Sequence, residues 1–200
     1  PPATPPVPTN APAPPRPPER TPEELFQAGL KLWDGKGVTK DPAEAVRLFQ
    51  QAAERDHVNA QAYLAGAYRT GVGTDKHPEE AVRWFRAAAE RGDARSQGVL
   101  ASIYGTGEGV TKDLPEAVKW YRLAAEQGLV RAQANLGAML YLGQGVAKDP
   151  VEAYKWLHLA ALKNDPDALK NRAMVAKVLS VEHMATGRKR ASEFVPVKSR

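Results

Sequence analysis

The stretch GTGEGVTKD, from Gly105 to Asp113, decides the fold because close copies of its second part return along the chain at a fixed interval. The copies are GKGVTKD from Gly35, GVGTDKH from Gly71, GEGVTKD from Gly107 and GQGVAKD from Gly143, so the glycine pair recurs every 36 residues. An alanine, a large apolar residue and an alanine pair keep the same register. They are Ala45, Ala81, Ala117 and Ala153; Leu48, Trp84, Trp120 and Trp156; and Ala52-Ala53, Ala88-Ala89, Ala124-Ala125 and Ala160-Ala161. A fixed period of this length predicts an array of stacked units, each of which buries its apolar face on its neighbours.

The glycine stretch also invites comparison with a phosphate-binding loop, but its spacing does not fit one. A Walker-type loop needs two glycines separated by four residues and followed by Lys and Ser or Thr. The nearest segment runs from Gly29 to Gly35 and Lys36, but five residues intervene and Gly37 stands where the hydroxyl should be. We therefore interpret the stretch as a repeat turn and predict that it binds no nucleotide.

Each unit is predicted to hold two helices separated by the glycine turn. In the second unit the first helix runs from about Asn59 to Thr70, and the second runs from Pro78 to Arg91. Asp-Pro-x-Glu caps open the second helix at Asp41-Pro-Ala-Glu44 and Asp149-Pro-Val-Glu152. The recurring glutamates at its third position are therefore interpreted as capping residues; they are Glu44, Glu80, Glu116 and Glu152. The alanine pairs let neighbouring helices approach closely, and the tryptophans fill the core beside them.

Composition divides the chain into three segments. Residues 1–20 contain ten prolines and few large apolar residues, so they are predicted to form a disordered arm. Residues 21–167 hold the four repeats. Residues 168–200 are predicted to form C-terminal capping helices and a basic tail, with one helix from Asp165-Pro166 to about Val178 and another capped by Ser180 that carries Phe194. A polar outer face on these helices would close the array.

The net charge of +5 is spread unevenly along the sequence. Residues 168–200 carry eight Lys and Arg against two Glu, whereas the repeats carry 18 basic and 20 acidic residues. A basic groove along the repeats is therefore not indicated, and we predict no nucleic-acid partner. The sequence has no run of 18 apolar residues, so we predict no membrane span, and it has no cysteine, so disulfides are excluded.

No motif for catalysis or metal binding is present in the sequence. The histidines occupy non-equivalent repeat positions and show no metal-ligand spacing; they are His57, His77, His158 and His183. There is no G-x-S-x-G element and no Ser-x-x-Lys pair. We predict that the protein is not an enzyme and holds neither metal nor cofactor, although a site assembled only on folding would escape this search.

The complete repeat pattern, L-G-x-x-Y-x-x-G-x-G-V-x-x-D-x-x-x-A-x-x-W-x-x-x-A-A-x-x-G, resembles the Sel-one-like repeat, a relative of the tetratricopeptide repeat. The resemblance covers residues 23 to about 167. Departures are local: His77 replaces the capping Asp, Thr74 replaces Val, Leu140 takes the Tyr place, and Asp56 and Asn164 stand where the closing Gly is expected. The resemblance implies an all-α, right-handed α-solenoid of four 36-residue helix-turn-helix repeats with C-terminal capping helices. It also implies a bacterial, non-catalytic scaffold for protein partners, which we expect to be a monomer.

Two alternatives to a scaffold stay open. One is an exported, cell-wall-associated ligand binder or hydrolase, because some relatives have been suggested to bind or hydrolyse such compounds. The other is a regulatory tether, in which the proline-rich arm connects the array to something upstream. The chain begins with Pro rather than Met, so we expect a processed or truncated product whose export signal could have been removed. Since many bacterial members are exported, the expected location is the periplasm or the medium, with the cytoplasm as the alternative.

By resemblance to tetratricopeptide arrays, the first helix of each unit lines the concave face. Its core residues Leu64, Leu100 and Leu136 then fix which neighbours point into the groove. Two sets of residues on these helices are predicted to bind the partner. Asn59, Arg95 and Arg131 occupy equivalent positions, and Trp33, Arg69 and Tyr141 project from the ends of the helices. Arg95 and Arg131, about one repeat apart, would each grip a carboxylate of an extended or helical peptide, and Trp33 and Tyr141 would offer apolar contact. The competing interpretation is that these arginines are solvated surface residues.

Overall fold

The structure is a computed structural model that describes residues 19–197, and these residues form ten α-helices without a strand. Residues 1–18 of the predicted disordered arm lie outside the described residues, as do residues 198–200. The helices are α1 (Pro22–Asp34), α2 (Pro42–Ala53), α3 (Val58–Thr70), α4 (Pro78–Glu90), α5 (Ala94–Thr106), α6 (Leu114–Glu126), α7 (Val130–Leu142), α8 (Pro150–Ala161), α9 (Pro166–Ala176) and α10 (Val181–Ser192).

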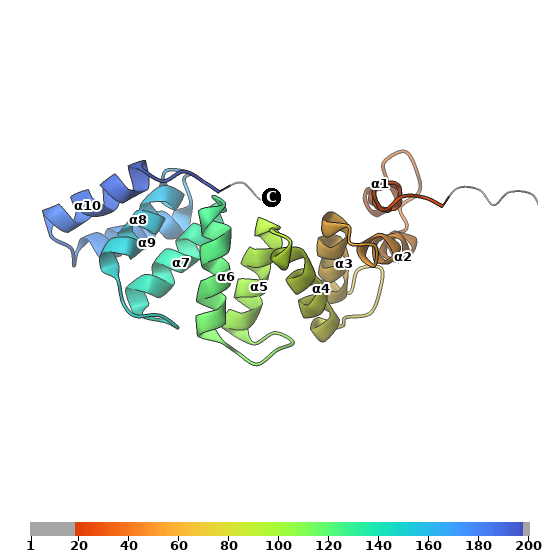
Figure 1. Ribbon diagram of the computed structural model, residues 1–200, viewed down its shortest axis with the longest axis horizontal. Coiled ribbons are helices and arrows are strands. Elements are labelled where there is room, and N and C mark those ends of the chain that lie inside the picture. The colour runs from red at the N-terminus through yellow and green to blue at the C-terminus, as the bar shows by residue number, and fades with distance from the viewer. Residues whose placement is uncertain (1–18, 198–200) are drawn as a thin grey trace, which may run out of the picture.

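The first eight helices form four antiparallel pairs, α1–α2, α3–α4, α5–α6 and α7–α8, which we call the first to fourth repeats. The second helix of each pair also packs on the first helix of the next pair. Repetition of these two contacts arranges the helices along an arc with α1 and α10 at its ends (Figure 1). The fold is thus an all-α solenoid, as the 36-residue period predicted.

The two glycines of each turn have different physical tasks. The first one ends the first helix in a left-handed conformation, as at Gly71 with φ +77° and Gly107 with φ +84°. The second one also has a positive φ, and in the second to fourth repeats it lies against the preceding repeat. A Cβ atom on Gly73 would lie 2.3 Å from the carbonyl oxygen of Pro42, which begins α2. The glycine pair therefore shapes the turn and sets the close contact between repeats.

Aspartate caps explain how α2, α6 and α8 begin, but capping does not explain the row of glutamates. The Asp41 side chain accepts a hydrogen bond from the Glu44 N–H, 3.0 Å away. The Glu44 carboxylate does not bond back to the cap; it pairs with Arg47 at 2.6 Å. Glu80, Glu116 and Glu152 likewise pair with the cation three residues later. Among the described helices, only α1 has a reciprocal capping box, so the capping interpretation of this row was wrong.

Two departures from the repeat pattern are accommodated without changing the fold. His77 begins α4 without a side-chain capping bond. Asp56 and Asn164, which replace the closing glycine, adopt left-handed φ values of +64° and +61°. Such values are uncommon outside glycine but are best tolerated by Asn and Asp.

The core follows the predicted register. Leu64, Leu100 and Leu136 have no exposed surface, and all four alanine pairs are buried. Trp120 and Trp156 are buried, whereas Trp84 is only half-buried.

A further repeated feature was not predicted: three buried glutamines each donate a hydrogen bond to a carbonyl of the preceding second helix. The pairs are Gln61 with Ala53, Gln97 with Ala89 and Gln133 with Ala125.

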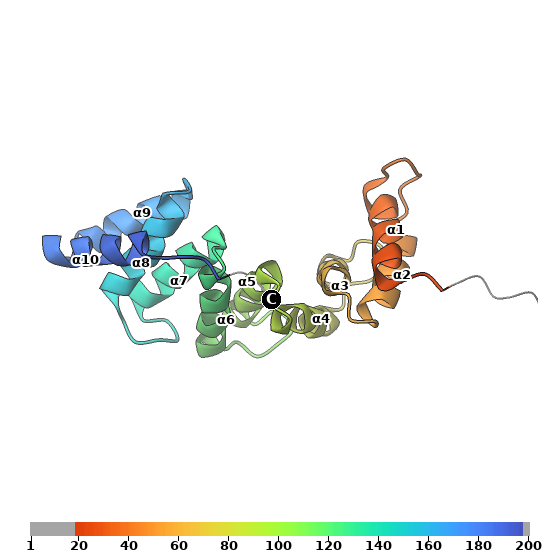
Figure 2. The ribbon, with the colours of Figure 1, turned by 45° about the horizontal axis from the view of Figure 1, so that its top comes forward.

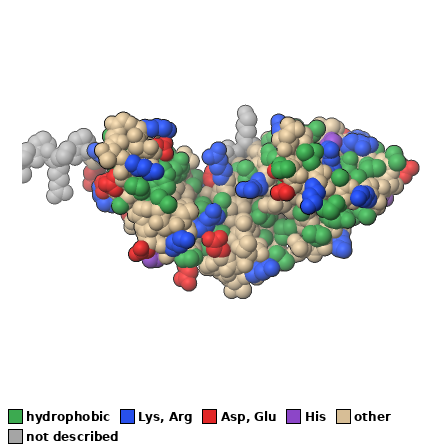
Figure 3. Space-filling view, turned by 180° about the vertical axis from the view of Figure 1, so that it is seen from behind, with side chains coloured by type: hydrophobic (Ala, Val, Ile, Leu, Met, Phe, Trp, Pro, Cys, Tyr) green, Lys and Arg blue, Asp and Glu red, His purple; other side chains and the backbone are tan. Residues whose placement is uncertain are grey.

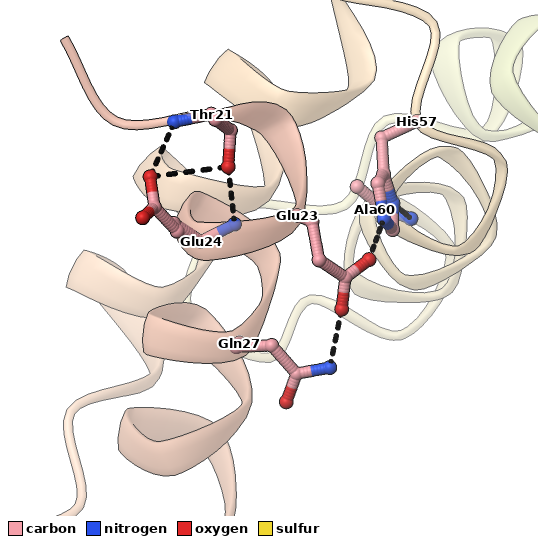
Figure 4. A network of polar contacts seen from close by, with 6 residues as sticks. All are labelled: Thr21, Glu23, Glu24, Gln27, His57 and Ala60. Carbon is pink, nitrogen blue, oxygen red and sulfur yellow. Dashed lines mark hydrogen bonds and ion pairs between the residues drawn. The ribbon is translucent and has the colours of Figure 1, made fainter.

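At the N-terminal end, polar contacts join α1 to α3 (Figure 4). The His57 ring accepts the Ala60 N–H at Nδ1, 3.1 Å away, and its Nε2 lies 2.8 Å from Oε2 of Glu23. A neutral ring that accepts at Nδ1 donates from Nε2. The hydrogen bonds from His57 and Gln27 lower the pKa of Glu23. His57 therefore caps α3 and ties the first repeat to the second.

At the C-terminal end, α9 packs on α8 where another first helix would follow, whereas α10 crosses back onto α8. A Cβ atom on the buried Gly187 would lie 2.9 Å from the Tyr154 ring, which shows how closely α10 approaches α8. Phe194 lies beyond the end of α10 rather than on it, with its ring 5.4 Å from that of Trp156. The chain then runs back towards α6, where the Val197 N–H donates to the Glu126 carbonyl (Figures 1 and 2).

The outer face of this C-terminal cap is less polar than expected. Leu169, Met174, Val178 and Val181 are exposed there. The cap covers the end of the array, but not with a purely polar surface.

Candidate functional site

One hollow brings together side chains from the second, third and fourth repeats. This central cavity has a volume of about 500 Å³. Its lining is contributed by α3, α5, α6 and α7 and by the connection before α7. The lining residues are Arg69, Arg95, Gly98, Val99, Ser102, Tyr121, Leu129, Arg131, Ala132 and Asn135. Three of the six residues that the sequence predicted, Arg69, Arg95 and Arg131, thus lie around one space.

Helical spacing explains why α5 and α7 present these residues to the same space. Arg95, Val99 and Ser102 are separated by four and three residues, so they share one face of α5. Arg131 and Asn135 share a face of α7 in the same way. The buried leucines Leu100 and Leu136 hold the opposite sides of these helices in the core. The core register of the two repeats therefore aims both arginines at the cavity.

The three arginines carry charge that the described residues do not neutralise. None of the ion pairs among residues 19–197 involves Arg69, Arg95 or Arg131. Arg95 and Arg131 are exposed, whereas Arg69 is half-buried with its guanidinium 6.0 Å from the Phe85 ring. The cavity lining contains no Asp or Glu. On the face shown in Figure 3, Lys and Arg side chains spread over the middle of the array with few acidic side chains among them.

A buried tyrosine contributes a polar group to this arginine-rich space. Burial raises the pKa of the Tyr121 phenol, while Ser102, Asn135 and the charge of Arg131 act in the opposite direction. The phenol therefore keeps its proton at neutral pH and can donate a hydrogen bond. Ser102 and Asn135 add neutral hydrogen-bonding groups, and Val99, Leu129 and Ala132 supply apolar surface.

The other three predicted site residues lie outside the central cavity. Trp33 packs into the aromatic core of the first repeat, with its ring 5.8 Å from Phe49 and 6.5 Å from Tyr63. Tyr141 is half-buried against the core of the third and fourth repeats. Asn59 is exposed in the first turn of α3. Apolar burial thus draws both aromatic residues towards the core.

Sequence reasoning missed Tyr121 and Leu129, together with the polar pair Ser102 and Asn135. The helical spacing from Arg95 and Arg131 could have identified Ser102 and Asn135. Tyr121 occupies the position held by Phe49, Phe85 and Leu157 in the other repeats. Its hydroxyl, a polar group at an otherwise apolar position, was the sequence feature that could have identified it. Leu129 lies in a connection between repeats, and no periodic pattern marked it as a lining residue.

Other parts of the described chain offer less for binding. A hollow of about 510 Å³ at the N-terminal end mixes Arg20, Arg47 and Arg55 with Glu19 and Glu54. Within residues 19–197 no cluster of three His, Cys, Asp or Glu could hold a metal ion. None of the described helices combines the length and apolar character that crossing a membrane requires.

Comparison with known families matches four consecutive segments of the chain. The matching family is described as the Sel1 repeat, and the segments are residues 25–57, 58–93, 94–129 and 130–165. The junctions between successive segments fall between the helix pairs of the structure. The sequence has no match among curated proteins.

Solved structures of bacterial repeat proteins share the architecture. A Sel1 repeat protein from Oxalobacter formigenes is 31% identical with a TM-score of 0.75, and the match covers 88% of this chain and 74% of that one. The protective antigen c5321 of uropathogenic Escherichia coli, which displays an SLR fold, is 27% identical with a TM-score of 0.59; the match covers 87% of this chain but 45% of that one. Helicobacter pylori cysteine rich protein B shares the fold at 24% identity with a TM-score of 0.51, covering 68% of this chain and 98% of that one.

Proposed function

Because the chain belongs to the Sel1 repeat family, we propose that it is a non-catalytic protein-interaction scaffold whose partner docks in the central cavity. Arrays of stacked repeats present extended surfaces that suit a protein or peptide ligand. The cavity accepts side chains of a partner, and the rest of the array supplies a long surface around them. The partner is expected to contribute an extended or helical segment.

One observation carries this proposal: the cavity is built from three successive repeats. Arg69 comes from the second repeat, Arg95 and Tyr121 come from the third, and Arg131 comes from the fourth. No single repeat contains the site, so binding depends on the stacked array. The three arginines have rigid planar donor groups, which suit recognition of carboxylates on a partner.

Charge reversal at two lining residues is expected to abolish partner binding. In the double variant Arg95→Glu with Arg131→Glu, two donors become acceptors and the cavity becomes acidic. Since both side chains are exposed, the helical melt should stay close to that of the wild type. The partner is first recovered from the native host by co-purification with the wild-type array, and its affinity is then measured by calorimetry. We expect a loss of at least a hundredfold, because two charge-assisted contacts are replaced by repulsion.

A matched control distinguishes the effect of the cavity arginines from the effect of the protein's total charge. Arg83→Glu with Lys119→Glu makes the same charge change on the exposed sides of α4 and α6. This control should bind the partner within about threefold of the wild type, since distant surface charges contribute little. Undiminished binding by the folded Arg95→Glu, Arg131→Glu variant would rule out the central cavity as the docking site.

A further inference from the structure

The charge composition of the central cavity differs from that of the other described hollows. The hollow at the N-terminal end contains both signs of charge, and Arg55 there lies 3.6 Å from Glu19. A third hollow, of about 330 Å³, combines Lys76 and His77 with Glu79 and Glu80. The central cavity has cations only, in a repeat region that carries slightly more acidic than basic residues. Its positive charge is therefore local and is not an effect of the basic C-terminal tail.

Two of these cations lie where an isolated helix would disfavour them. Arg95 and Arg131 are the second residues of α5 and α7, and neither helix has an acidic residue in its first turn. The N-terminal end of a helix carries partial positive charge, so a cation there is locally unfavourable. The nearby Asp93 is used to cap α5 by accepting the Ser96 N–H at 2.6 Å, and it does not line the cavity. An anion in the cavity would relieve this accumulation of positive charge.

The residue that begins α7 supplies apolar surface to the cavity instead of a helix cap. Its N-cap residue is Leu129, which makes no side-chain capping bond, so this helix begins without the acceptor that Asp or Ser provides elsewhere. The same Leu129 lines the cavity and lies against Gly98, where a Cβ atom would be 2.8 Å from its Cδ2 atom. Apolar surface thus lies directly beside the cationic groups.

We infer that the central cavity binds a carboxylate side chain of the partner together with the apolar side chain next to it. This inference rests on the proposed function and names the chemistry of the docking segment, a peptide in which Glu or Asp is followed by a residue such as Leu. Arg95 and Arg131 present paired N–H donors to the carboxylate, and Arg69 adds charge from the neighbouring repeat. Val99, Leu129 and Ala132 receive the apolar side chain.

This chemistry predicts discrimination between Glu and Gln. A neutral amide has the shape of the Glu side chain, but it cannot accept two charge-assisted bonds or compensate the three guanidinium groups. Its NH₂ group would also place further donors beside three guanidinium groups, which cannot accept a hydrogen bond. The site should therefore favour Glu over Gln by at least about tenfold, the difference expected for one charge-assisted hydrogen bond.

The test measures binding of two labelled ten-residue peptides to the full chain by fluorescence anisotropy. One peptide carries two Glu-Leu pairs in a Gly and Ser background, and the other carries Gln-Leu pairs at the same places. The wild-type protein should bind the Glu peptide at least about tenfold more tightly than the Gln peptide. Arg95→Gln and Arg131→Gln should each weaken binding of the Glu peptide by about tenfold and leave binding of the Gln peptide within twofold.

Arg83→Gln is the matched control, because it removes the same charge from the exposed side of α4, where Arg83 pairs with Glu80 at 2.9 Å. The control should bind both peptides as the wild type does. Equal affinity of the wild type for the two peptides would overturn the inference. An equal loss in Arg83→Gln and Arg131→Gln would also overturn it, because binding would then follow net charge.

Failure of this inference is distinguishable from failure of the proposed function. If the Glu peptide does not bind but charge reversal at Arg95 and Arg131 still releases the co-purified partner, the cavity docks a partner by other chemistry. If the peptide binds as expected but the charge-reversed protein retains its partner, the carboxylate site exists and the partner docks elsewhere.

Discussion

Alanine in place of Gly73 is expected to destabilise the array by about 2–5 kcal/mol, whereas alanine in place of Gly37 should cost about 1–2 kcal/mol. The two glycines have almost the same backbone conformation, with φ values of +76° and +74°. They differ in their surroundings. A Cβ atom on Gly73 would lie 2.3 Å from the Pro42 carbonyl oxygen, whereas nothing lies within 4 Å of one on Gly37. Comparison of the two variants therefore separates the free-energy cost of the left-handed conformation from the cost of overpacking between repeats.

The measurement is chemical unfolding followed by circular dichroism, with both variants compared with the wild type. Gly66→Ala serves as a third variant, because Gly66 lies inside α3 with open space around it and no positive φ. That substitution should stabilise the helix by about 0.5–1 kcal/mol. If Gly73→Ala and Gly37→Ala unfold at the same denaturant concentration, the close contact between repeats does not determine stability.

Removal of residues 180–200 is expected to unfold the fourth repeat selectively. This truncation deletes α10 and the segment that follows it, which uncovers Tyr154 and Trp156 on α8. Exposure of two large aromatic side chains costs about 3–6 kcal/mol. Since each repeat contacts only its neighbours, the loss should be local. Hydrogen exchange should become fast in α7, α8 and α9 and stay slow in α2 and α4.

A point variant controls for the polar contacts of α10. Arg190 pairs with Glu152 at 3.2 Å, but its side chain is 49% exposed. Arg190→Ala should therefore cost less than about 1 kcal/mol, as exposed ion pairs usually do. Unchanged protection of α8 in the truncated protein would show that α10 does not act as a cap.

The sequence period predicted most of the fold because each repeated position has one physical cause. Glycine at the turn provides positive φ, alanine at the helix contacts provides close approach, and leucine provides the core. The glutamate row was misread because a carboxylate at the third helical position can serve either the cap or a cation three residues later. The backbone N–H of Asp41, which a capping box would offer to Glu44, donates instead to the Leu32 carbonyl, so the Glu44 carboxylate pairs with Arg47.

The path of α10 could not be predicted from periodicity. The second helices of the first three repeats contact the glycine turn of the following repeat, as Pro42 contacts Gly73. No repeat follows α8, so its corresponding surface is open and α10 packs there with Gly187. A helix that replaces a missing neighbour has no counterpart elsewhere in the sequence.

The lining of the central cavity was predicted in part for a related reason. Helical position identified Arg95 and Arg131, which are equivalent in α5 and α7, and Arg69 near the end of α3, but Asn59, which is equivalent to Arg95, lies outside the cavity. Equivalence failed for Trp33 and Tyr141, whose large apolar rings pack towards the core instead. Tyr121 and Leu129 come from a second helix and a connection, and only tertiary packing brings them to the cavity.

The measurement that tests the central claim most directly is site-specific photocrosslinking in the native host. A photoreactive amino acid is placed at Ser102, which lines the cavity, and in a separate variant at Lys119, which does not. Lys119 lies two residues before Tyr121 on α6 and therefore on the opposite side of that helix, with its side chain 61% exposed. We predict a discrete protein adduct from position 102 that disappears when Arg95→Glu and Arg131→Glu are added, and no such adduct from position 119. An adduct from position 119 alone, or one from position 102 that survives both charge reversals, would contradict docking in the central cavity.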